Sequence, residues 1–135
     1  MRQVNFRYIV NDVDAALEFY CGALGFEVVM HPAPQFAMIE KDELCLGLSA
    51  PSGPGGGAQG AADGTKPTPG GWNRIALYTT DLRQDVERLR AAGVRFRNEI
   101  IDGVGGRQIL AEDPSGNPVE LFQPTRQEAR LSRDG

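Results

Sequence analysis

The chain has 135 residues, of which 41% are hydrophobic and 24% charged, an ordinary composition for a single globular domain. Its formal net charge is −4 and no basic run stands out, which argues against a nucleic-acid partner. No apolar run approaches the roughly 20 residues that a membrane-spanning helix needs, so we expect no membrane partner. Met1 leads directly into a strand-like pattern without a signal peptide, and Cys21 and Cys45 lie in apolar contexts. We therefore expect a cytoplasmic protein with two buried thiols.

The first 50 residues predict a β-α-β-β-β module. Asn11 or Asp12 can cap a helix, Gly25 can end it, and apolar residues recur between them at helical spacing. The predicted elements are a strand over 4–10, a helix over 13–23, and strands over 26–30, 36–40 and 44–48. His31, the chain's one histidine, falls in a proline-flanked segment that we interpret as a solvated loop. Phe19 and Tyr20 are predicted core residues.

Residues 51–71 are mostly small residues and proline, and we expect a flexible linker there. The pattern then restarts: a strand over 74–80, a helix over 82–92 capped by Thr80 or Asp81, and a strand over 94–97. A loop over 101–106 leads to a hairpin whose strands, 107–112 and 118–123, flank the turn 113–117. Residues 72–124 thus form a second β-α-β-β-β module, and 125–135 form a polar tail. Such an internal repeat indicates duplication of one unit.

We expect an α+β fold in which helices cover one face of each sheet, and the other faces curve around a shared cleft. Four segments carry a family resemblance: residues 10–20 (VNDVDAALEFY), 24–26 (LGF), 74–82 (RIALYTTDL) and 106–122 (GRQILAEDPSGNPVELF). With these segments the chain resembles the vicinal oxygen chelate superfamily of glyoxalases, bleomycin-resistance proteins and extradiol dioxygenases. The resemblance also implies a homodimer, and the linker would permit exchange of modules between chains.

In the enzymes of this superfamily a divalent metal sits in the cleft, held by His, Glu or Gln from the first and last strands of the modules. The corresponding positions here are Asn5, Gly47, Arg74 and Glu120. Only Glu120 keeps a ligand type, because Gly47 has no side chain and Arg74 is a permanent cation without a lone pair. The residues therefore predict that neither a metal nor another cofactor is bound, and that Arg74 pairs with Glu120 instead.

The alternation of the strands predicts a set of cleft-facing residues that would contact a ligand: Asn5, Arg7, Arg74, Tyr78, Glu120 and Phe122, joined by Arg107 and Ile109 from the neighbouring strand. Two interpretations of the Arg74–Glu120 pair stay open: it closes a filled core, or it orients a ligand. Trp72 either anchors the start of the second module or covers the cleft by stacking on a planar ligand.

These residues predict a metal-free binding protein of the bleomycin-resistance type. It would sequester a small, flat antibiotic or metabolite, and the acidic balance favours a cationic one. The alternative is an enzyme of the same superfamily: a lyase, isomerase or dioxygenase that holds a metal elsewhere, or a catalyst with Glu120 as its base. A third hypothesis is an accessory domain that binds another protein and has a filled cleft.

Overall fold

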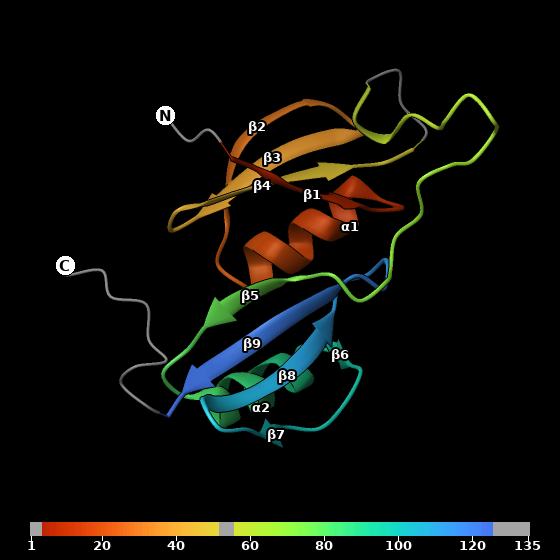
Figure 1. Ribbon diagram of the computed structural model, residues 1–135. Coiled ribbons are helices and arrows are strands. Elements are labelled where there is room, and N and C mark those ends of the chain that lie inside the picture. The colour runs from red at the N-terminus through yellow and green to blue at the C-terminus, as the bar shows by residue number, and fades with distance from the viewer. Residues whose placement is uncertain (1–3, 52–55, 126–135) are drawn as a thin grey trace. The chain divides into compact units, whose positions relative to one another are not determined.

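A computed structural model describes residues 4–51 and 56–125 (Figure 1). These residues form two compact units: 4–51 and 56–71 with Asp113–Asn117, and Trp72–Glu112 with 118–125. Each unit contains one sheet together with helical structure, so the expected α+β class with two sheets is confirmed. The predicted tail lies outside the described residues except for Thr125, as does part of the predicted linker, 52–55. Within the described part of the chain, no helix is long and apolar enough to cross a membrane.

The first unit contains a four-stranded sheet in the order β1-β4-β3-β2. Its strands are β1 (Phe6–Ile9), β2 (Glu27–Ala33), β3 (Phe36–Lys41) and β4 (Leu44–Ser49). Strands β1 and β4 are parallel, and the other neighbours are antiparallel. Between β1 and β2 the chain forms helix α1 (Val13–Leu17), which continues as the π-helix η1 (Glu18–Ala23). Asp12 caps α1 by accepting a hydrogen bond from the Ala15 amide.

Aromatic side chains form the centre of this unit. Tyr20 is fully buried, and its ring lies 4.9 Å from that of Phe19, 5.7 Å from Phe26 and 6.0 Å from Tyr8 between ring centroids. The buried placement of Phe19 and Tyr20 is as predicted. Tyr8 and Val10 are buried, and the residues between and beside them are more exposed. The alternation in the sequence therefore identifies the buried face of β1 correctly.

Two local expectations for this unit are wrong. His31 lies within β2, not in a loop, because β2 tolerates its proline through two shifts of register against β3. Cys21 is half-buried, whereas Cys45 is buried as expected. The flexible linker stays a prediction; within it, residues 56–58 form a 3-10 helix (η2, Gly56–Ala58) in which Ala58 is buried.

The second unit contains strands in the order β5-β9-β8-β6, with β7 also pairing β8. Their bounds are β5 (Ile75–Tyr78), β6 (Arg95–Phe96), β7 (Ile101–Asp102), β8 (Gly106–Glu112) and β9 (Pro118–Pro124). Helix α2 (Leu82–Ala91) buries Leu82, Val86 and Leu89 and covers one face of this sheet (Figure 1). Asp81 caps it, and Gly93 follows it at a φ of 89°. The segment 101–106, predicted as a loop, contributes β7 and the first residue of β8.

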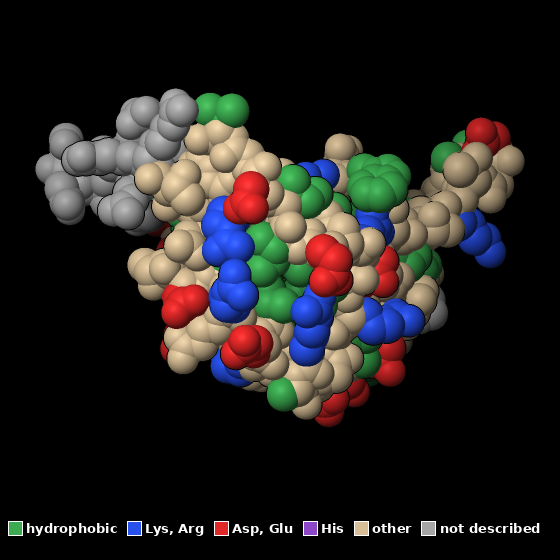
Figure 2. All heavy atoms as spheres, turned by 90° about the horizontal axis from the view of Figure 1, so that it is seen from below, with side chains coloured by type: hydrophobic (Ala, Val, Ile, Leu, Met, Phe, Trp, Pro, Cys, Tyr) green, Lys and Arg blue, Asp and Glu red, His purple; other side chains and the backbone are tan. Residues whose placement is uncertain are grey.

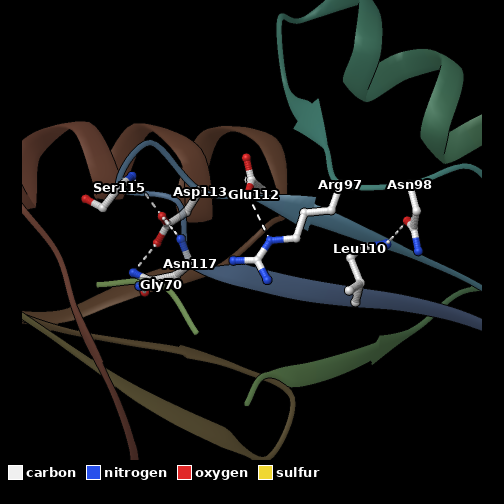
Figure 3. Close-up of polar contacts among 8 residues, drawn as sticks. All are labelled: Gly70, Arg97, Asn98, Leu110, Glu112, Asp113, Ser115 and Asn117. Carbon is white, nitrogen blue, oxygen red and sulfur yellow. Dashed lines mark hydrogen bonds and ion pairs between the residues drawn. The ribbon is translucent and has the colours of Figure 1, made fainter. Parts of the chain in front are cut away.

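The turn between β8 and β9 packs with the first unit, although the sequence places it in the second module. Its buried Asp113 accepts hydrogen bonds from the amides of Ser115 and Asn117 and from the Asn117 side chain (Figure 3). The Tyr20 hydroxyl donates to Oδ2 of this carboxylate at 2.9 Å, the oxygen that also accepts from the Asn117 side chain. Asn117 in turn donates to the Ile9 carbonyl and accepts from the Gly70 amide. A buried charge is stable here because every side of it is hydrogen-bonded.

The hydroxyl of Tyr20 gives a pH prediction. Burial, followed by the nearby Asp113 charge, raises the pKa of Tyr20 far above its ordinary value of 10.0. Above about pH 10 the unfolded chain therefore loses this proton while the folded chain keeps it, so stability falls as pH rises. Tyr20→Phe should cost about 1–2 kcal/mol near neutral pH, and its stability should then fall less steeply above pH 10.

Urea unfolding across this pH range measures both effects. Tyr78→Phe is the matched control, because Tyr78 is 49% exposed. Its curve should follow that of the wild type. Parallel pH slopes for the wild type and Tyr20→Phe would contradict the prediction.

Candidate functional site

One face of the second unit's sheet gathers most of the predicted site residues. In the register, Glu120 lies opposite Leu110 on β8 and beside Ala76 on β5, and Phe122 lies opposite Gln108 and beside Tyr78. Residues directly paired across strands share a face, so these side chains lie together. Val119 and Leu121 point the other way and are buried on the side that α2 covers. We call the side that bears Glu120 the helix-free face.

Glu120 is held by two neighbours on this face. The Arg74 guanidinium donates to its Oε1 from Nε at 3.1 Å and from Nη2 at 2.9 Å. The Gln108 amide nitrogen donates to both oxygens of Glu120, at 3.1 Å each, when it faces the carboxylate, the orientation that pairs a donor with acceptors. The Arg74 and Glu120 side chains are 30% and 17% exposed. The predicted Arg74–Glu120 pair is therefore present, and it is partly buried.

A second ion pair lies on the same face. The Arg97 Nε donates to Glu112 at 2.8 Å, and the two side chains are 16% and 24% exposed (Figure 3). The Arg97 guanidinium also lies over the ring of Trp72, 4.7 Å from its centroid. Arg74 links the two pairs, since its Nη1 donates to the Trp72 carbonyl at 3.1 Å. Trp72, Arg74, Arg97, Glu112 and Glu120 thus form one connected polar cluster.

The other end of the helix-free face is aromatic. The rings of Tyr78 and Phe122 are 5.2 Å apart and tilted by 51°. Tyr78 is 49% exposed, as is Ile101, which pairs with Gln108 and so shares the face. The face therefore offers charged groups at one end and apolar surface at the other, a combination suited to orienting a small organic molecule.

Two predicted site residues, Arg107 and Ile109, lie on the opposite face. Arg107 pairs with Gln123, and Ile109 is fully buried opposite Leu121. Arg107 makes an ion pair with Asp102 at 2.8 Å. The expectation that they share a face with Glu120 is wrong, because it shifts the register by one residue, which turns every side chain to the other side.

The remaining predicted residues belong to the first unit. Asn5 is exposed and precedes β1, while Arg7 on β1 lies beside Gly47 on β4. Arg7 donates to the Gly57 carbonyl at 3.0 Å. A side chain at Gly57 would come within 2.6 Å of Arg7, so η2 approaches this sheet closely. The convergence of Asn5 and Gly47 with Arg74 and Glu120 stays a prediction.

The four positions that would hold a divalent metal do not fit one. Gly47 supplies no donor atom, and a Cβ added there would contact Phe36 and Arg7 at 3.6–3.7 Å. Both oxygens of Glu120 face N–H donors, and a guanidinium at the carboxylate would repel a second cation. Among the described residues, no group of three or more His, Cys, Asp or Glu side chains could hold an ion.

Surface charge is mixed on the face of the molecule that Figure 2 shows. Basic and acidic side chains alternate there around exposed hydrophobic ones, and neither sign forms a broad patch. This arrangement agrees with the absence of basic runs in the sequence and offers no extended track for a phosphate backbone.

Comparison with known proteins decides the family. Residues 2–121 match the family model described as the glyoxalase/bleomycin resistance protein/dioxygenase superfamily. The chain belongs to this superfamily. No curated protein sequence matches it significantly. Among solved structures, it is similar to a superfamily member from Sphaerobacter thermophilus at 29% identity and a TM-score of 0.70, covering 91% of this chain and 98% of that one.

Two further structures illustrate the range of this superfamily. An antibiotic binding protein from a Streptomyces species is 25% identical with a TM-score of 0.65, covering 93% of this chain and 98% of that one. A fosfomycin resistance protein from Listeria monocytogenes is 20% identical with a TM-score of 0.70, covering 97% and 98%. At this identity the likeness to the Listeria protein shows the fold alone.

Sequence reasoning missed Arg97, Gln108 and Glu112. The signal for two of them was available: a turn over 113–117 makes Glu112 and Pro118 the first pair, which places Leu110 opposite Glu120 and Gln108 opposite Phe122. Arg97 carried no such signal, because its position depends on how β6 pairs with β8.

The partial burial of the Arg74–Glu120 pair predicts a measurable coupling. In a double-mutant cycle of Arg74→Met and Glu120→Gln, the coupling energy should be about 1 kcal/mol by chemical denaturation. The Arg90–Glu99 pair is the control, because it has a similar distance of 3.1 Å while its side chains are 48% and 85% exposed. That cycle should give less than about 0.5 kcal/mol. Equal couplings would show that burial adds nothing to the site pair.

Proposed function

We propose that the protein binds a small organic molecule on the helix-free face of its second unit, without a metal, as a sequestering protein of the antibiotic-binding kind. The observation that carries this proposal is the Arg74–Glu120–Gln108 arrangement. At two positions where metal-dependent superfamily enzymes would place ligands, this chain has a guanidinium hydrogen-bonded to a carboxylate. Binding would replace metal chemistry with hydrogen bonding and aromatic contact.

The chemistry of the face supports such a role. Arg74 is 30% exposed, so a ligand oxygen can approach a guanidinium whose position is already fixed by Glu120. Tyr78 and Phe122 supply an aromatic surface, and the two ends together fix orientation as well as affinity. The Streptomyces relative is itself an antibiotic binding protein, which supports this class of ligand. Cys21 and Cys45 are free thiols, in keeping with the cytoplasmic location that we propose.

A thermal-shift screen tests this function. The panel contains bleomycin, fosfomycin, planar polycyclic antibiotics and the chlorides of Zn²⁺, Ni²⁺ and Mn²⁺. At least one organic compound should raise the unfolding midpoint through mass action, and none of the metals should bind stoichiometrically. For a hit, Arg74→Met should weaken binding by about tenfold, the loss of one charge-assisted hydrogen bond, and Glu120→Gln should weaken it by a smaller factor, because Arg74 loses its anchor and stays in place as a donor.

Arg90→Met serves as the control, because Arg90 lies on α2, against the other face of the sheet. It should leave the affinity unchanged. One equivalent of tightly held metal in the purified protein would contradict the proposal. A turnover that Glu120→Gln abolishes while binding persists would favour an enzyme instead.

We also propose that the protein is a homodimer, and the edge strand β2 is a surface that suits self-association. Three consecutive residues of β2, Val28, Val29 and Met30, are 52%, 48% and 48% exposed. β2 lies at the edge of its sheet, so the outer side of its backbone is unpaired within the described part of the chain. Proteins that stay monomeric usually carry charged side chains at such positions of an edge strand.

Analytical ultracentrifugation distinguishes the states. The wild type should sediment as a dimer, and Val29→Lys should shift it toward the monomer, because a lysine there would be buried against the partner. Val104→Lys is the control, since Val104 is 76% exposed in the segment between β7 and β8. A monomeric wild type would contradict the proposal.

A further inference from the structure

We propose that Trp72 is a stacking platform for a planar aromatic ligand, and that Arg97 makes this platform select anionic or neutral ligands over cationic ones. This inference rests on the proposed function, because it names the ligand class of the same face. It also departs from the cationic ligand that the net charge alone favours.

The exposure of Trp72 suits a stacking platform and not a core anchor. It is 68% exposed, whereas an anchoring indole would be buried. The ring is nevertheless held, because Arg97 lies against it at 4.7 Å from the centroid and Glu112 holds Arg97 at 2.8 Å. The backbone of the same residue is held by Arg74. A ligand that stacks on the exposed side therefore meets a ring whose position is already fixed, which lowers the entropy cost of binding.

The two ion pairs are both oriented with the positive end toward Trp72. The Arg97 guanidinium contacts both the indole ring and Glu112, and the Arg74 guanidinium contacts both the Trp72 carbonyl and Glu120. At close range the nearer charge of each pair dominates the field. The indole's attraction for cations is already used by Arg97 on one side, so a second cation on the other side would be repelled. A carboxylate or phenolate on a stacked ring would be attracted.

Collisional quenching of the Trp72 fluorescence tests the electrostatic field around the indole ring, without any assumption about the ligand. Trp72 is the only tryptophan in the chain, so the indole fluorescence reports on this residue alone. Iodide should quench it more effectively than caesium, after normalisation to free N-acetyltryptophanamide at constant low ionic strength. Arg97→Met should reduce the iodide-to-caesium ratio by a factor of about two to five, and Arg97→Lys should retain part of it.

Arg83→Met is the matched control. It removes the same charge from an exposed residue of α2, on the other side of the sheet. It should leave the ratio nearly unchanged. A wild-type ratio equal to that of the free compound, or an equal effect of Arg83→Met and Arg97→Met, would overturn the role of Arg97. Circular dichroism of each variant confirms that it is folded.

Calorimetry with naphthoate, naphthamide and naphthylmethylammonium tests stacking with one ring system at three charges. Affinity should fall in that order, Trp72→Ala should abolish binding, and Trp72→Phe should retain part of it. Arg97→Met should reduce the preference for naphthoate over naphthylmethylammonium by about two- to fivefold.

Tightest binding of naphthylmethylammonium, no binding of any of the three, or binding that persists in Trp72→Ala would each overturn the inference. An antibiotic hit whose affinity ignores Trp72→Ala would leave the proposed function intact and remove only the platform. A screen without hits, together with naphthoate binding that depends on Trp72, would remove only the antibiotic class of ligand.

Discussion

The carboxylate of Glu120 is the constraint on which the character of the second unit's helix-free face depends. It lies in the middle of the sheet, on β9 between β5 and β8, where an unpaired charge would be costly. Arg74 and Gln108 together place N–H donors on both of its oxygens. A carboxylate that is satisfied in this way is a poor metal ligand, because coordination would require a donor to leave. It is, however, a good anchor for a guanidinium that must present a fixed surface to something else.

Much of the fold could be predicted from local chemistry. Asp12 and Asp81 cap their helices, and Gly25 and Gly93 follow the helical segments at positive φ, because these features depend only on near neighbours in the chain. Alternation likewise assigned the faces of β5 and β9 correctly. The same reasoning failed for Arg107 and Ile109, where the side chains across a hairpin depend on register and not on alternation alone. There the turn residues, and not the strand residues, held the required information.

Other features could not be predicted because they depend on contacts between distant segments. Asp113 reads as an ordinary turn residue, and nothing in the turn reveals that its carboxylate accepts a hydrogen bond from Tyr20, 93 positions earlier. Arg97 follows the short strand β6 and reads as one of many surface arginines. Its role depends on its contacts with Trp72, which precedes it by many positions in the sequence, and with Glu112, which follows it. In β2, a proline that normally ends a strand is accommodated by irregular pairing with β3, which composition does not reveal.

The charge of the whole chain and the charge at the candidate site favour different ligands, and distance decides between them. The net charge of −4 is spread over the protein, and at about 0.1 M salt exposed charges more than roughly 10 Å apart are largely screened from each other. The guanidinium of Arg97 lies 4.7 Å from the Trp72 ring centroid and is only 16% exposed at the side chain, so it is screened far less. The overall charge therefore acts weakly on the approach of a ligand, whereas the guanidinium groups act at contact, where affinity is determined. A cation that is part of the protein also differs from a bound metal: it cannot be exchanged, its donors lie in one plane, and it favours flat ligands with oxygen at their edge.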